Sequence, residues 1–187
     1  MMHGTRSLPI WPNTIYGPVQ VWCRSHRADP IARRLADRHY NRQKIGTPQF
    51  VPPGSCCVFV TLNQKAFWVT SAPKPEYVKH AWAGAWVCSA FRSEGAGQAS
   101  DLIRLAIAAT RHHYEDRIPD LGMVTFIDPT KVKPIINWHN GKKTWGRTWL
   151  KAGFKPVGET KGGLLAFQIL PRDMPDALSP LPPPAPL

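Results

Sequence analysis

The stretch from residue 85 to residue 114 constrains the fold most, because it contains the signals of a strand, a glycine turn and a helix in direct succession. Residues 85–91 (AWVCSAF) have the apolar and aromatic content typical of strands. They run into residues 92–97 (RSEGAG), after which residues 98–114 carry apolar side chains at helical spacing. Backbone amides that converge at such a junction can bind an anion, helped by the helix dipole. A tight turn before an ordinary capped helix explains the hexapeptide equally well.

The other elements predict one sheet with helices on its faces. Asp29 is expected to cap the first helix, with Pro30 at its first position. The order of elements predicts an α/β (α+β) fold with a mixed, mostly antiparallel sheet flanked by helices. Strands are expected at residues 19–23, 56–62, 66–70, 85–91 and 123–127, a closing hairpin at 155–157 and 164–170, and helices at 30–40, 98–114 and 144–151.

A single folded domain is expected, because 187 residues suit one hydrophobic core. Residues 1–16 are expected to be flexible and residues 17–170 to fold. Residues 171–187 are rich in proline, which removes backbone donors and favours extended conformers, so this tail is expected to be disordered. The four cysteines lack the paired spacing of structural zinc sites. With no signal peptide or membrane span in the sequence, we expect a cytoplasmic protein that does not associate with membranes.

The charge points to a polyanionic partner. Lys and Arg outnumber Asp and Glu by 24 to 12, which gives a formal net charge of +12. Nucleic acid is the first candidate, because each cation set against a phosphate releases condensed counterions. A basic but merely solvated surface is the alternative. The residues expected to contact DNA are Arg38, Arg42, Lys131, Lys133, Lys142 and Lys143.

Residues 37–42 (DRHYNR) place polar and aromatic groups where the first helix gives way to a proline-rich loop, residues 41–54. His39 can titrate near neutral pH, and Tyr40 offers a hydroxyl and a stacking face. The flanking arginines suit phosphate contacts. A solvated helix end with one half-buried ring is the simpler alternative.

The glycine turn resembles the coenzyme A binding segment of the GCN5-related N-acetyltransferase (GNAT) family. That family has Arg or Gln, two further residues, and then Gly-x-Gly or Gly-x-Ala at a strand-to-helix junction, which residues 92–97 match. Residues 146–154 (GRTWLKAGF) are similar to the family's late helix and following Gly-Phe. The resemblance implies an acetyltransferase-like fold that binds acetyl-CoA or a related donor. The implied cofactor-binding residues are Arg92, Gly95, Ala96 and Gly97.

The chain departs from that family on the late helix. Many members carry a Tyr there that protonates the departing thiolate, whereas this chain has Trp145 and Trp149, which cannot act as acids. His139, Tyr114 or a water molecule is an open alternative for the acid. An ordinary acetyl-CoA-dependent N-acetyltransferase acting on a protein or a small molecule is the alternative function. A DNA-binding protein without catalysis is a second alternative.

A second resemblance, over residues 30–168, is to the Mom family of phage enzymes that modify adenine in DNA. It implies a transferase that adds a carbamoylmethyl group to the exocyclic amine of adenine in double-stranded DNA, protecting phage DNA from host restriction. It also implies a location in the cytoplasm of a bacterial host. The matching segments are His39-Tyr40, residues 91–94 (FRSE), 99–103 (ASDLI), 125–129 (TFIDP), 151–154 (KAGF) and 160–164 (TKGGL).

This resemblance implies catalytic roles for His39, Tyr40, Arg92 and Asp128. It raises Fe(II) as a further cofactor, with His39 and Asp128 as candidate ligands and the third ligand unidentified. The expected partner is double-stranded DNA, and a homodimer is left open.

An adenine inside a duplex cannot reach an enclosed site, so we expect the base to flip out, with Tyr40 or a nearby Trp as its stacking face. The space that it vacates would need a wedge. Trp138 and Trp145 are candidates, although each is also typical of a core.

Overall fold

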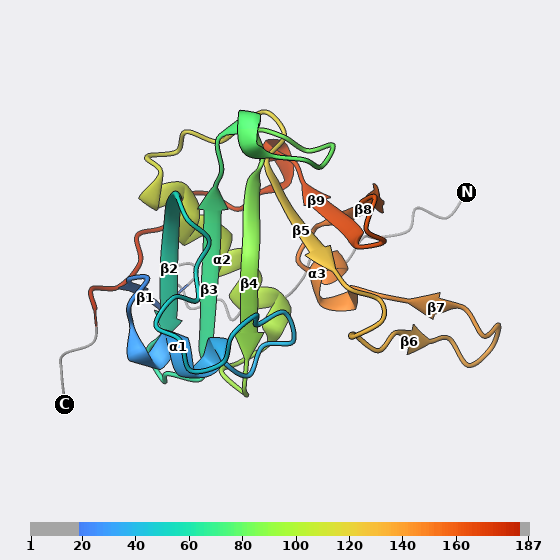
Figure 1. Cartoon of the computed structure of the whole chain (residues 1–187), viewed down its shortest axis with the longest axis horizontal. Coiled ribbons are helices and arrows are strands. Elements are labelled where there is room, and N and C mark those ends of the chain that lie inside the picture. Colours follow the sequence, from blue (N-terminus) through green and yellow to red (C-terminus); the bar gives the residue numbers. More distant parts are fainter. Residues whose placement is uncertain (1–18, 184–187) are drawn as a thin grey trace, which may run out of the picture.

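The computed structural model describes residues 19–183, which form a seven-stranded sheet between two helices (Figure 1). The expected flexible segment, residues 1–16, lies outside the described residues. The sheet strands are β1 (Trp22–Ser25), β2 (Ser55–Thr61), β3 (Ala66–Ala72), β4 (Trp86–Ser93), β5 (Met123–Ile127), β8 (Lys155–Glu159) and β9 (Leu165–Ile169). A separate ribbon consists of β6 (Ile135–Ile136) and β7 (Lys143–Thr144). The helices are α1 (Pro30–Ala36), α2 (Ala99–His113) and α3 (Arg147–Lys151), with single 3-10 turns η1 (Pro75–Tyr77) and η2 (Pro171–Asp173).

The strand order is β1-β2-β3-β4-β5-β9-β8, and every neighbouring pair is antiparallel except β4 and β5. The mixed, mostly antiparallel sheet is therefore confirmed. The parallel pairing is short, because it joins only residues 86–88 of β4 to residues 123–125 of β5. β4 then continues to Ser93 without β5 as its partner. The two strands therefore separate in the middle of the sheet.

The core lies on both faces of the sheet, because successive side chains of a strand point in opposite directions. In β2, Val58 and Val60 pack with α1, whereas Cys57 and Phe59 pack with α2. Figure 1 shows α1 and α2 on opposite faces. α2 is the longest helix among residues 19–183, with 15 residues, and no helix there has the length and hydropathy of a membrane span. The two helices thus cover opposite faces of the sheet.

The start of α1 follows the expected capping pattern. The Asp29 carboxylate accepts hydrogen bonds from the amides of Ile31 and Ala32, and Pro30 occupies the first turn. The helix ends at Ala36 rather than at residue 40. After Ala36 the hydrogen bonds span three residues instead of four, since the amide of His39 donates to the carbonyl of Ala36. His39 and its neighbour Tyr40 consequently lie in the loop after α1.

The proline-rich tail is ordered over residues 171–183, which corrects the expectation that residues 171–187 are disordered. Met174 is buried, with 7% of its surface exposed. Leu181 pairs with β1, because its amide donates to the carbonyl of Trp22 and its carbonyl accepts from the amide of Arg24. The amide of Leu178 also donates to a carbonyl of α2. Residues between the prolines thus keep the donors and apolar side chains that attach the segment to the body.

Candidate active site

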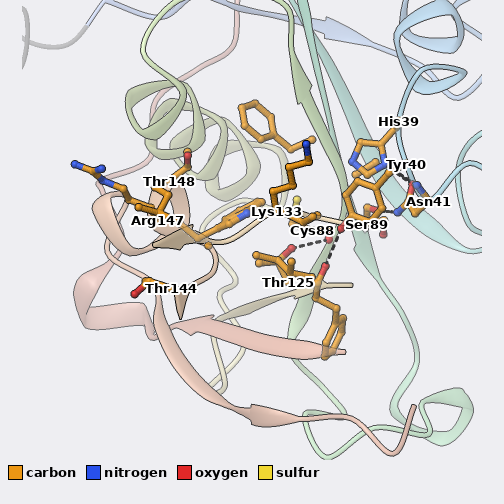
Figure 2. Close-up of a pocket in the computed structure, with 18 residues that line it drawn as sticks. His39, Tyr40, Asn41, Cys88, Ser89, Thr125, Lys133, Thr144, Arg147 and Thr148 are labelled. Atoms are coloured by element: carbon orange, nitrogen blue, oxygen red, sulfur yellow. Dashed lines mark hydrogen bonds between the residues drawn. The ribbon is translucent and has the colours of Figure 1, made fainter. Parts of the chain in front are cut away.

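A cleft of about 270 Å³ lies where β4 and β5 separate (Figure 2). Its floor includes Cys88 and Thr125, the last residue pair that joins the two strands. Ligands commonly bind beyond the carboxyl ends of parallel strands, where side chains can enter the gap. The loop after α1 forms one wall and the start of α3 the other, and Figure 2 shows Lys133 between them. The cleft therefore brings together three segments that are distant in the sequence.

His39 and Tyr40 lie side by side on the first wall. Their rings stack with centroids 4.6 Å apart and an angle of 27° between their planes. The Tyr40 hydroxyl donates to the carbonyl of Phe126 at 3.5 Å, which connects the loop to β5. Nδ1 of His39 is hydrogen-bonded to Oδ1 of Asn41, whose amide group donates to the carbonyl of Ser89 at 3.2 Å. The backbone amide of Asn41 also donates to Nδ1 at 3.3 Å, so the hydrogen bonds of the ring are compatible with either neutral tautomer, and in each of them one ring nitrogen is unprotonated.

The environment keeps both side chains uncharged near neutral pH. Burial lowers the pKa of His39 below its usual value, and the nearby charge of Arg92 lowers it further. Burial raises the pKa of the Tyr40 phenol. The pair therefore combines a neutral base with a neutral hydroxyl donor at one side of the cleft.

The glycine turn is tied to this wall through Glu94. Its carboxylate accepts hydrogen bonds from Nε and Nη2 of Arg38 at 2.6 and 2.7 Å and from Nε of Arg92 at 2.8 Å. These two guanidinium groups lower the pKa of Glu94 to about 2. Because Arg38 directly precedes His39, the turn and the His-Tyr pair are fixed next to each other. The cleft lining itself reaches Phe91, the residue before Arg92.

The backbone of the turn needs its glycines for conformation and remains open. Gly95 has φ +80° and Gly97 has φ +150°, values that favour glycine, and a Cβ added to Gly95 would meet nothing within 4 Å. Gln98 makes no side-chain capping hydrogen bond at the start of α2. The amides of Glu94 and Ala96 already donate, to the carbonyl of Lys65 at 2.7 Å and to Oγ of Ser93 at 3.3 Å, so within the turn the amides of Gly95 and Gly97 are the candidates for contact with an anion. The four expected cofactor-binding residues, Arg92 and Gly95 to Gly97, all belong to this turn.

Asp128 is near Tyr40, but its carboxylate is engaged locally. It accepts hydrogen bonds from the amide and hydroxyl of Thr130 at 2.9 and 2.6 Å, which lower its pKa and make it the first residue of a turn. Asp128 and Tyr40 both border a second hollow of about 340 Å³. Between residues 19 and 183, no three His, Cys, Asp or Glu side chains are grouped so as to hold a metal ion. The described residues therefore do not fit the expected iron site of His39, Asp128 and a third ligand.

Arg42 has a structural role within the loop, and its expected contact with DNA stays a prediction. Its side chain is only 8% exposed and pairs with Asp37 at 2.8 Å. Its remaining nitrogens donate to the carbonyls of Gln49 and Thr47, both at 2.6 Å. The guanidinium group therefore holds the loop of residues 41–54 together, and few of its donors are free for phosphate.

The other basic residues expected at DNA are more accessible. Lys133 lines the cleft, and the side chain of Lys131 is 56% exposed. Lys142 and Lys143 belong to the ribbon of β6 and β7 and are exposed. The side chain of Arg38 is 44% exposed and is paired with Glu94. These five residues surround the cleft and the adjoining ribbon.

The tryptophans differ in placement. Trp149 packs between Trp68 and Phe91 at the core, and Trp145 donates its indole N–H to the carbonyl of Val132 at 3.1 Å. Trp138 is 84% exposed, so its expected alternative role in a core is wrong.

Neither side chain considered as an alternative acid lines the cleft. Tyr114 stacks on Trp86, and His139 lies beside Trp138 at the ribbon tip. Sequence reasoning missed Asn41 and Ser89 as site residues. For Asn41 the signal was its position next to the His-Tyr pair, whereas Ser89 gave none, because it lies inside an apolar strand.

Comparison with known proteins gives no match, whether with protein-family models, curated proteins or solved structures.

Proposed function

We propose that this protein is a transferase with an acetyltransferase-like fold that modifies the exocyclic amine of adenine in double-stranded DNA. The proposed donor is acetyl-CoA or a related molecule. The proposed product is the carbamoylmethylated adenine that resemblance to the Mom family implies, a mark that protects phage DNA from host restriction. The observation that carries the proposal is the placement of His39 and Tyr40 at the cleft between β4 and β5, tied by Glu94 to the glycine turn before α2.

Two adjacent hollows with shared lining residues support a reaction between two substrates. The cleft and the second hollow share Tyr40, Asn41, Cys88, Ser89 and Phe126. A donor held at the glycine turn and a base entering from the other side would therefore meet beside Tyr40. The combined space suits small groups rather than a protein segment, since typical ligand sites measure roughly 300–1,000 Å³.

The chemistry asked of this chain is mainly positioning, because the amine of adenine is a poor nucleophile whose lone pair is delocalised into the ring. A flipped base stacked on the Tyr40 ring would present its amine to the cleft. As the nitrogen forms its new bond to carbon, it must lose a proton, and the unprotonated ring nitrogen of neutral His39 would accept it. When bound, the donor would supply a carbon bonded to a leaving group, which would depart with the bonding electron pair as the amine attacks. For the carbamoylmethyl product this donor must already carry the carbamoylmethyl group, because the acetyl group of acetyl-CoA would give an N-acetyl amide. Lys131 and Lys133 would contact phosphates at the rim.

Nucleoside mass spectrometry of DNA from cells that express the protein tests the proposal. Wild-type protein should give a new adenine species, and His39→Ala should reduce it at least about 100-fold, the usual contribution of a general base. Tyr40→Phe keeps the stacking ring and should retain more product than Tyr40→Ala. Lys74→Ala, an exposed change at η1 outside both hollows, is the matched control. An unchanged adenine pool with wild-type protein would overturn the proposal, and an acetylated protein or amine in its place would favour an ordinary acetyltransferase.

A further inference from the structure

The ribbon of β6 and β7 projects from the body of the protein (Figure 1). Ile135 and Thr144, which pair at its base, both line the cleft. Ile136 and Lys143 form the next pair, and residues 137–142 form the tip. The ribbon therefore extends outward from one wall of the candidate active site.

Hydrogen bonds within the tip fix its shape. The amide of Asn137 donates to the carbonyl of Lys142 at 2.9 Å, and the amide of Gly141 donates to the carbonyl of Asn137 at 2.7 Å. The side chain of Asn137 accepts from the amide of His139 at 2.9 Å. A tip closed by such local bonds presents its side chains in a set arrangement.

That arrangement exposes a large aromatic surface. Trp138 is 84% exposed and Ile136 is 58% exposed. The ring of His139 lies against the indole, with centroids 3.4 Å apart. An exposed indole ring is stabilised when a binding partner covers its faces and removes them from water.

The charge around the ribbon identifies the kind of partner. Residues 129–158 contain seven Lys or Arg residues and no Asp or Glu. A polyanion would neutralise such a segment, and a duplex adds bases, which are flat surfaces on which an indole can stack. Proteins that unstack DNA insert apolar wedges between base steps in the same way.

We propose that the β6–β7 ribbon is a DNA-binding arm whose Trp138 indole inserts into the base stack beside the adenine that enters the cleft. This inference rests on the proposed function. Trp138 is three residues from Ile135 at the cleft, or roughly 10 Å along an extended chain. The inserted indole would therefore lie within about three base-pair steps of the flipped adenine, since each step rises about 3.4 Å. The arm would stabilise the gap that flipping leaves.

The experiment uses the full chain and duplexes that carry 2-aminopurine, whose fluorescence rises when it is unstacked. Trp138→Ala should weaken duplex binding about tenfold and abolish most of the fluorescence rise, because base–aromatic stacking is lost. Trp138→Phe should recover part of both. The matched control is Tyr77→Ala, which removes another exposed ring, 77% exposed, at η1 outside the cleft. Thermal melts should show that neither exposed substitution unfolds the protein.

Salt dependence separates stacking from phosphate contact. Trp138→Ala should leave the slope of log K against log salt unchanged, whereas Lys142→Gln and Lys143→Gln should each lower its magnitude by about 1. If the Trp138→Ala protein binds the duplex and raises the 2-aminopurine fluorescence as much as the wild-type protein does, the role of the ribbon as a DNA-binding arm is refuted. The proposed function would still stand. If wild-type protein binds no duplex at all, the proposed function fails and the arm with it. Trp138-dependent binding to phosphatidylserine vesicles without duplex binding would overturn the arm in favour of a membrane surface.

Discussion

Glu94 and Arg38 form a two-point ion pair, in which the two carboxylate oxygens lie 2.6 and 2.7 Å from Nε and Nη2 of the guanidinium group. One partner precedes His39 and the other lies in the turn before α2. Arg92 contacts the same carboxylate at 2.8 Å. The distance between the base at the cleft and the turn that we assign to the donor is thus set by one side chain.

Glu94→Gln should therefore reduce transfer more than stability. The glutamine side chain is uncharged and has one acceptor oxygen, so it cannot pair with both guanidinium groups. The value of kcat/KM should therefore fall about tenfold, as expected when reacting groups are slightly misplaced. The melting temperature should change little, because exposed ion pairs contribute little to stability. Asp116→Asn is the matched control, since it breaks the two-point pair with Arg111 away from the cleft. Full activity in Glu94→Gln would show that the pair does not position the site.

The same pair should resist acid. The arginines depress the folded-state pKa of Glu94 from 4.5 to about 2, so the stability that the pair provides is complete above pH 4.5 and is lost as pH falls through about 2. Carboxyl NMR titration of the wild-type protein should show Glu94 still ionised at pH 3.5. A Glu94 midpoint at or above 4.5 would contradict the pairing seen here.

His39 should impose the acid limit on activity. Its pKa is lowered from 6.5 by burial, and only the neutral ring can accept a proton. The acid limb of kcat/KM should accordingly lie below pH 6.5 and should flatten in His39→Gln. The free energy of unfolding should also decrease as the pH falls below 6.5. The reason is that His39 binds a proton more readily in the unfolded chain than in the folded protein. The test is a pH profile of single-turnover transfer, and a limb above 6.5 would assign the base to another group.

Arg42→Ala should unfold the loop after α1 rather than weaken phosphate contacts. Removing this side chain leaves Asp37 unpaired and takes donors from the carbonyls of Thr47 and Gln49, a loss of about 2–4 kcal/mol for a largely buried group. Urea unfolding measures that loss. Lys133→Ala, in contrast, should leave the free energy of unfolding unchanged and should reduce the dependence of duplex binding on salt concentration. An Arg42→Ala protein of normal stability would contradict the assigned role.

Met174→Ala should destabilise the domain by about 1.5–3 kcal/mol, the usual contribution of a buried apolar side chain. Deletion of residues 171–187 should cost more, because the two hydrogen bonds between Leu181 and β1 are lost as well, each contributing about 1 kcal/mol. Denaturant unfolding followed by tryptophan fluorescence would measure both changes. A truncated chain as stable as the full one would show that the attachment of the tail to the body is weak.

Local signals made much of the fold predictable. Asp29 and Pro30 determine where α1 begins through their own backbone geometry, and the limits of β5 follow from its apolar residues. The end of α1 was predicted four residues too late, because the helical spacing continues past Ala36 while the backbone tightens there. The two-residue strands β6 and β7 are too short to give a periodic signal.

Parts of the candidate site depend on contacts that a sequence pattern does not contain. His39 and Tyr40 were expected to act together, and the structure stacks them at the cleft. The structural role of Arg42 was not predicted, because its partners at residues 47 and 49 depend on the path of the loop. The Pro-rich tail was misread because composition predicts its lack of regular structure but not the pairing of Leu181 with β1.

That pairing has a consequence for lateral growth of the sheet. An uncovered strand edge is a template for another chain, and here the residues after η2 cap the β1 side. At the far side, β8 is exposed along its length, but Pro156 has no amide to donate and the register slips between Pro156 and Gly158. Neither border of the sheet therefore offers an easy continuation. These features disfavour the pairing of a second copy of this protein along either edge of the seven-stranded sheet.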